Sequence, residues 1–169
     1  MKQSFIAALG AALILGIPAV PAFASSPDAA FARMAAQGGT AEVMEARLAL
    51  GKSSNSMVDA FARRMLHDHI PNNQQLQAIM MREGIPIPRM VDPADQAMMA
   101  RLHMQRGRAF DAAYLQGQVT AHEKMLSLLQ NEVTSGSDPR LRAYARMTIP
   151  VIRMHLAMAR RDVAMMSRM

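Results

Sequence analysis

Apolar residues recur along this chain every three, four or seven positions, which is the spacing of one face of an α-helix. In the stretch after Ser53 and Ser54, the apolar stripe consists of Val58, Phe61, Met65, His69, Leu76 and Met80. Similar stripes run through residues 115–133 and 141–166, where His122 and His155 occupy apolar positions. The sequence lacks the alternation that is typical of β-strands, so the pattern predicts an all-α protein.

Helix caps and breakers divide this pattern into four long helices and a short one. The long helices are predicted at residues 28–50, 55–83, 108–134 and 139–169. The short helix lies within residues 91–105, with Asp92 as its cap and Pro93 in its first turn. The second long helix is expected to take its cap from the Ser53-Ser54 pair. Gly38 and Gly39 weaken the first helix in its middle.

The lengths of the connections indicate how the helices are arranged. About three residues join the first two long helices, and about three join the last two, so each pair should form an antiparallel hairpin. The segment between the hairpins is long enough to cross the whole bundle, which would make the second and third long helices parallel. The sequence therefore predicts a four-helix bundle of ferritin-like topology, with a long crossover that contains the short extra helix.

The N-terminal residues have the pattern of an export signal. Lys2 precedes a long apolar run, which ends in Pro21 and the small-residue pattern of residues 22–24. We expect residues 1–24 to be a cleaved signal peptide and residues 25–169 to form a single domain in the periplasm; an uncleaved anchor is the alternative. No second apolar run could span a membrane, so no transmembrane segment is expected after cleavage. The chain has no cysteine, which excludes disulfides and thiolate metal sites.

The net charge of +6 is concentrated towards the C-terminus. Arg146, Arg153 and Arg160 recur every seven residues and therefore share one helical face. A solvated outer face is the simplest interpretation, and weak contact with an anionic envelope surface is the second. Nucleic-acid binding is not expected, because basic and aromatic residues are not interleaved. The sequence does not identify a partner protein.

Candidate chemistry centres on three histidines and one carboxylate. Counted from the ends of the predicted helices, Glu42, His69, His122 and His155 fall within about 10 Å of one another along the bundle axis. Two interpretations stay open. Buried histidines can form a hydrogen-bonded polar network in a core, and converging histidine and carboxylate groups can also bind a first-row metal.

The segment RRMLHDHIPNN, residues 63–73, contains the first of these histidines. His69 follows the inward apolar stripe, whereas we expect His67 to face outward with Asp68 beside it. Pro71 lacks the backbone N–H that the carbonyl of His67 would accept, so a kink is expected there.

Residues at helical spacing from the histidines narrow the chemistry. A carboxylate di-iron bundle needs Glu-x-x-His on two helices, and this sequence has no such motif. Methionines do stand at helical spacing from the histidines: Met65 is four residues before His69, Met125 three after His122 and Met158 three after His155. A thioether combined with imidazole suits copper, above all Cu(I). Because the chain has 18 methionines and methionine is a flexible core filler, core packing is the simpler explanation. The sequence establishes no cofactor, and copper or another first-row metal is the candidate.

Four segments of the chain closely resemble the exported bacterial proteins of domain-of-unknown-function family 4142. They are FARMAAQGGTAEVMEARLAL, VDAFARRMLHDHIPNNQQL, GRAFDAAYLQGQVTAHEKMLSLL and IPVIRMHLAMA. The resemblance implies a ferritin-like helical bundle, and the family has no settled biochemical activity. The positions of this chain that match the polar residues of the family's pattern are Glu42, His69, Asp111, His122 and His155. Asp111 is expected to be a polar residue of the core.

These features predict a structural or stress-associated envelope protein and not an enzyme. The sequence has no nucleophile elbow, phosphate loop or zinc-protease helix motif. One alternative is a metal-binding protein with a copper-type histidine and methionine site in mid-bundle. The other is an interaction module that binds an anionic envelope surface through its arginine face.

Overall fold

The computed structural model describes residues 26–168, and these residues form five helices. The four long helices are α1 (Pro27–Lys52), α2 (Ser56–Arg82), α4 (Gly107–Ser135) and α5 (Pro139–Met166). The short helix α3 (Pro93–Met104) lies in the connection between α2 and α4. The predicted signal peptide lies outside the described residues.

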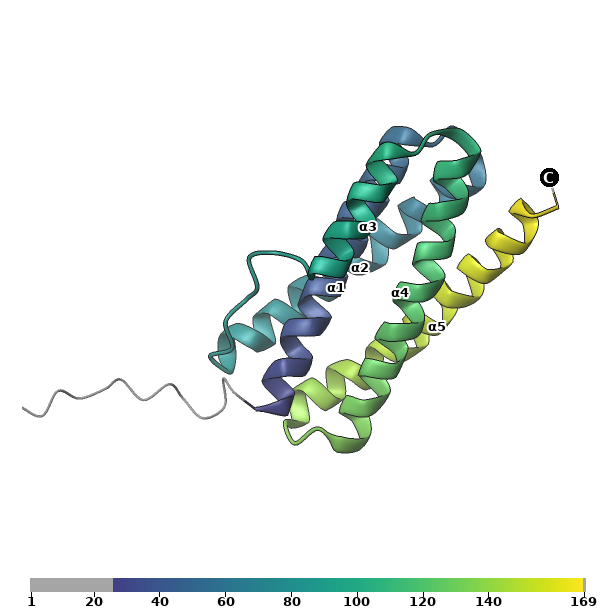
Figure 1. Cartoon of the computed structure of the whole chain (residues 1–169). Coiled ribbons are helices and arrows are strands. Elements are labelled where there is room, and N and C mark those ends of the chain that lie inside the picture. The colour runs from purple at the N-terminus through teal and green to yellow at the C-terminus, as the bar shows by residue number, and fades with distance from the viewer. Residues whose placement is uncertain (1–25, 169) are drawn as a thin grey trace, which may run out of the picture.

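The helices form two antiparallel hairpins joined by a crossover (Figure 1). Helix α1 packs mainly on α2, and α4 mainly on α5, while α1 with α4 and α2 with α5 connect the two hairpins. Residues 83–106 run back along the bundle, so α2 and α4 point the same way, and α3 lies against α1 and α4. The predicted all-α fold of ferritin-like topology, with a short extra helix in its crossover, is confirmed.

Helix starts follow the predicted capping chemistry with one correction. Asp92 and Asp138 cap α3 and α5 through their side chains, and a proline occupies the first turn of each helix. The cap of α2 is not the Ser53-Ser54 pair but Asn55, whose side chain accepts a hydrogen bond from the N–H of Met57 at 3.0 Å. The reason is that Ser53 is engaged elsewhere: its hydroxyl donates to the carboxylate of Asp111 on α4 at 2.6 Å.

Two apolar clusters fill the bundle, one towards each end. The first includes Phe61 and Met65 of α2 together with Phe110 and Tyr114 of α4. The second draws on all four long helices, and its large members include Phe31, Leu76, Met80, Leu129, Leu141, Tyr144 and Ile152. On each long helix the sequence between the two clusters carries at least one buried polar residue, and these residues are Glu42, Glu45, His69, His122 and His155. A polar layer therefore separates the two apolar halves.

Gly38 and Gly39 do not interrupt α1 but allow it to approach its neighbours closely. A methyl group at position 39 would overlap the side-chain oxygen of Asn73 on α2. One at position 38 would lie 2.8 Å from the terminal methyl of Met125 on α4. Both overlapped atoms are ends of side chains, so a methyl group at either position would require Met125 or Asn73 to shift.

Pro71 does not end α2, which continues as far as Arg82. The next residue, Asn72, connects α2 to α5: its side-chain N–H₂ donates to the hydroxyl of Tyr144 at 2.7 Å, and its carbonyl oxygen accepts from the hydroxyl of Thr148 at 3.1 Å. These two bonds hold α2 against α5 one turn after His69.

We expect the Gly39→Ala protein to be less stable than the wild type by about 1–3 kcal/mol, because the added methyl group overlaps Asn73. Gly51→Ala is the matched control in the same helix. No atom lies within 4 Å of a methyl group at position 51, so helix propensity should raise stability by up to about 1 kcal/mol. Urea unfolding measures both, and equal effects of the two substitutions would contradict the close-approach role of Gly39.

Candidate functional site

Three histidines from three helices meet in the polar layer. His69 of α2, His122 of α4 and His155 of α5 are at most 4% exposed. Their ring centroids are 5.2 Å (His69–His155), 5.3 Å (His122–His155) and 5.7 Å (His69–His122) apart. One ring nitrogen from each lies within 4.8 Å of the other two. The three side chains therefore point at one common centre.

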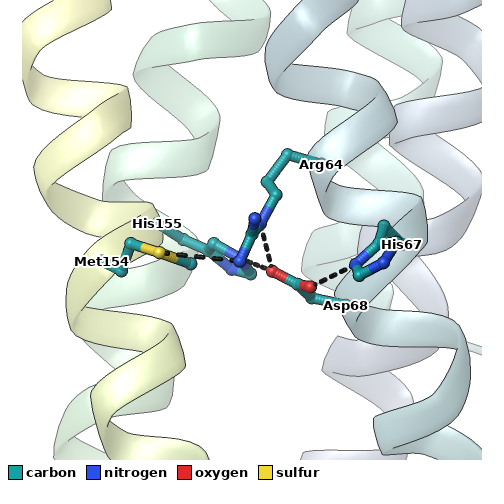
Figure 2. Close-up of polar contacts among 5 residues, drawn as sticks. All are labelled: Arg64, His67, Asp68, Met154 and His155. Atoms are coloured by element: carbon teal, nitrogen blue, oxygen red, sulfur yellow. Dashed lines mark hydrogen bonds and ion pairs between the residues drawn. The ribbon is translucent and has the colours of Figure 1, made fainter.

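Asp68 fixes the orientation of His155 from the neighbouring helix. Its Oδ2 lies 2.8 Å from Nε2 of His155 and also accepts from Nε of Arg64 at 2.6 Å. Its Oδ1 accepts from Nδ1 of His67 at 2.7 Å. Figure 2 shows this carboxylate between α2 and α5, with Arg64 reaching on to the sulfur of Met154.

Because Asp68 is an acceptor, His155 must donate its Nε2 proton, and its Nδ1 keeps the lone pair. The pKa of Asp68 supports this assignment. Burial alone would raise that pKa, but the hydrogen bonds from His67, His155 and Arg64 outweigh burial and bring it to about 2. The carboxylate is therefore ionised at neutral pH.

His122 is oriented by its own helix. Its Nδ1 donates to the backbone carbonyl of Gln118 at 2.8 Å, which leaves the lone pair on Nε2. Nε2 of His122, Nε2 of His69 and Nδ1 of His155 are all buried and have no hydrogen-bond partner. Each of the three imidazoles therefore has one buried ring nitrogen without a hydrogen-bond partner.

Burial keeps all three imidazoles neutral at physiological pH. It lowers the pKa of His69 to about 3, and the neighbouring His122 and His155 contribute to the shift. It also lowers the pKa of His122 to about 4 and that of His155 to about 4, against the raising effect of their hydrogen bonds to Gln118 and Asp68. Neutral imidazole is the form that binds metal ions.

Glu42 belongs to the same layer but not to the converging group. Its Oε1 lies 3.7 Å from Nδ1 of His122, on the edge of that ring that faces away from the centre, and its Oε2 is buried without a partner. Glu45, one turn further along α1, accepts from the side-chain N–H₂ of Gln118 at 2.9 Å. Burial raises the pKa of both carboxyl groups well above their usual range, and the charge of Glu42 adds to the shift of Glu45.

Cavities reach the histidine layer from two sides. One of 330 Å³ is lined by His69, His122, Glu42 and Glu45, together with the start of α3. The other, of 300 Å³, lies between α2 and α5 and is lined by residues that include His67, Asp68, His69 and His155. His69 lines both cavities, so both reach the layer that contains the histidines.

The remaining predicted residues are spread more widely. Met65 and Met158 lie in the apolar cluster that contains Phe61, whereas Met125 lines the 330 Å³ cavity with His69 and His122. Asp111 is buried as predicted, but its partner is Ser53 at the α1–α2 turn. It therefore joins the two hairpins at the end of the bundle and makes no contact with the histidines.

The arginine face of α5 is exposed, as the sevenfold spacing predicts. Arg146, Arg153 and Arg160 all lie at the surface, and Arg160 forms an ion pair with Glu123 of α4 at 2.7 Å. Contact of this face with an anionic envelope surface stays a prediction. Within residues 26–168, no helix combines the length and the hydropathy that crossing a membrane requires.

Sequence reasoning missed two residues that orient the histidines. Asp68 does not face outward with His67: its side chain is 12% exposed, against 78% for His67, and it turns towards α5. Its position directly before His69 and four after Arg64 was the available signal. Gln118 stands four residues before His122, which is the spacing that lets a helical side chain meet the preceding turn.

Comparison with known families and structures agrees with this architecture. The family described as Domain of unknown function (DUF4142) matches residues 18–161. The chain belongs to this family. Among solved structures, the chain is similar to the "DUF305 fragment from Deinococcus radiodurans", with a TM-score of 0.72, 16% identity, and coverage of 85% of this chain and 98% of that one. This likeness shows a shared fold. The search of curated proteins found no match.

We expect the metal-free protein to lose stability relative to its His69→Gln variant as the pH falls from about 6 to 4. The pKa of His69 is about 3 in the folded protein and near 6.5 when unfolded, so between these values only the unfolded state binds the proton. Lowering the pH therefore favours unfolding. One such proton gives a slope of about 1.4 kcal/mol per pH unit, which the variant lacks.

Urea unfolding of chelator-treated protein at stepped pH measures these slopes. His103→Gln is the matched control, because His103 lies exposed on α3 and its replacement should leave the wild-type slope unchanged. Identical slopes for the wild type and His69→Gln would show that His69 is solvated in the folded state.

Proposed function

We propose that this protein is an exported metal-binding helical bundle, whose site is formed by His69, His122 and His155. One observation carries the proposal: each of three buried histidines has a ring nitrogen within 4.8 Å of the other two rings' nitrogens, and each also has a buried ring nitrogen without a hydrogen-bond partner. First-row divalent ions need such a set of converging nitrogen donors.

A purely structural polar network explains this layer less well. In such a network each ring nitrogen would meet a donor or an acceptor. Here one nitrogen of His122 is bonded to Gln118 and one of His155 to Asp68, which leaves a lone pair on the second nitrogen of each ring. These second nitrogens, like Nε2 of His69, have no partner. Each unpartnered buried atom costs about 1–3 kcal/mol, and one cation would satisfy all three.

The hydrogen bonds of His122 to Gln118 and of His155 to Asp68 are of the kind that orients metal-binding histidines. A ligating histidine usually donates its second N–H to a carboxylate or a backbone carbonyl, which fixes the ring and its tautomer. His155 with Asp68 and His122 with Gln118 are examples of each kind. The scaffold therefore orients two of the rings before any ion binds.

The donor set favours Zn²⁺ or Cu²⁺. Imidazole suits both ions, whereas Cu(I) prefers thioether sulfur. Because Met65 and Met158 lie in an apolar cluster, a copper site here would depend chiefly on the three imidazoles, with Met125 as the nearest methionine in the shared cavity. Any bound ion would also lie in the layer that holds Glu42, whose carboxylate could supply a further donor or compensating charge.

We expect the purified protein to bind one Zn²⁺ or Cu²⁺ per chain, and the variant with all three histidines changed to Ala to bind none. His103→Ala, which removes an exposed histidine of α3, is the control and should bind like the wild type. Isothermal titration and elemental analysis after gel filtration measure the stoichiometry. Equal binding by the triple variant would exclude this site.

Asp68→Asn should weaken metal affinity by about 10- to 100-fold, because the amide no longer holds His155 with a charged acceptor. Asp59→Asn is the matched control on the same helix: Asp59 also pairs with an arginine four residues away but lies near the start of α2, far along the helix from His69. Competition with a chromophoric chelator measures both affinities. No difference between the two variants would show that Asp68 does not support the site.

Export to the periplasm is part of the proposal and rests on residues 1–24. If these residues are a cleaved signal, N-terminal sequencing of protein from the periplasmic fraction should begin at Ser25. Recovery of the intact N-terminus in the membrane fraction would favour an uncleaved anchor instead.

A further inference from the structure

The three histidines approach the common centre from only three of the four long helices. They belong to α2, α4 and α5, and the fourth helix, α1, supplies no histidine at this level. Metal ions with three protein ligands characteristically keep an additional coordination position for water or another molecule. Whether that position is blocked depends on what α1 presents to the centre.

Helix α1 presents small residues to this side of the layer. Gly38 and Ala41 line the 330 Å³ cavity, and the longer side chains that α1 contributes to its lining are Met34, Gln37, Glu42 and Glu45. His69 and His122 form the opposite wall of the same cavity. The space beside the histidines is therefore bounded by the helix that contributes none of them.

The lining of this cavity determines what could enter it. Its apolar part includes Met125 and Ile152, and its polar part contains four carboxyl groups and one ammonium group. These ionisable residues are Glu42, Glu45, Asp92, Asp95 and Lys124. Burial raises the pKa of Glu42 and Glu45 enough to keep them largely protonated, which leaves two aspartates against one lysine. This small excess of negative charge favours neutral or cationic molecules over anions.

We propose that the cavity between α1 and the histidines is a ligand site, in which a small neutral or cationic molecule with a nitrogen or oxygen donor binds the open position of the ion. This inference rests on the proposed function, because the ion supplies one of the contacts. The protein supplies the others: an apolar wall and the unpartnered Oε2 of Glu42, which can exchange a hydrogen bond with the bound molecule.

The test uses Co²⁺-loaded protein, because its visible absorption reports directly on coordination. Imidazole serves as the neutral donor probe and azide as the anionic probe, with cobalt content checked after each titration. Imidazole should change the spectrum with saturation and bind more tightly than azide. In Ala41→Leu the added side chain occupies the cavity, so imidazole affinity should fall by roughly tenfold or more.

Two further variants keep the test decisive. Ala121→Leu fills the same cavity from α4 at a half-buried position and replaces Ala41→Leu if that protein does not fold. Ala60→Leu adds the same side chain at an exposed position of α2 and should change nothing. In all three variants cobalt affinity should stay within about threefold of the wild type, because no histidine is altered.

The outcomes separate the two proposals. Absence of cobalt binding would overturn the proposed function itself. Cobalt binding with no spectral response to imidazole, or an equal response in the cavity-filled and control variants, would overturn the ligand site alone. Tighter binding of azide than of imidazole would overturn the inferred class of ligand.

Discussion

The burial of three imidazoles between two apolar clusters is the constraint on which the rest of the structure depends. Imidazole is polar at both nitrogens, so each ring placed in a core needs two partners or leaves an atom unsatisfied. Helix α4 supplies one partner from its own backbone, and α2 supplies another through a carboxylate that crosses to α5. Both arrangements satisfy the outer edge of a ring and direct the other edge inward. The close approach of α1 at Gly39 and the bonds of Asn72 to α5 hold the helices in the register that these contacts require.

Much of the fold followed from the sequence, because each helix carries its own boundary chemistry. Aspartate caps and first-turn prolines are local signals, and connection length alone distinguished a crossover bundle from a simple up-and-down one. The cap of α2 was less predictable. Ser53, Ser54 and Asn55 are all good capping residues, and the hydroxyl of Ser53 is bonded to Asp111, which lies far away in the sequence. The role of Gly39 also depends on a distant residue. Glycine within a helix is expected to lower helix stability, and only the structure shows that Asn73 packs against this position.

The sequence predicted the position of the site residues along the bundle axis, but not the direction in which each side chain points around its helix. Counting residues from the helix ends placed four polar residues in one layer, since rise per residue is nearly constant. Which way each side chain turns depends on the neighbouring helix and on rotamers, and these are tertiary properties. Asp68, one residue before His69, points about 100° away around α2 and so meets α5. Glu42 reaches the layer but meets the outer edge of His122. Counting residues along the helices cannot show whether Glu42 joins the three histidines or contacts only one of them.

The distribution of the histidines between the two hairpins has a mechanical consequence. His69 belongs to the first hairpin, and His122 and His155 belong to the second, with the crossover as the covalent connection between them. An ion held by all three would therefore cross-link the hairpins and close a long loop through residues 83–106. Closing such a loop restricts the unfolded chain in the manner of a disulfide. In a protein without cysteine, an ion bound to three imidazoles would connect the two hairpins, and a chelator instead of a reductant would release this connection.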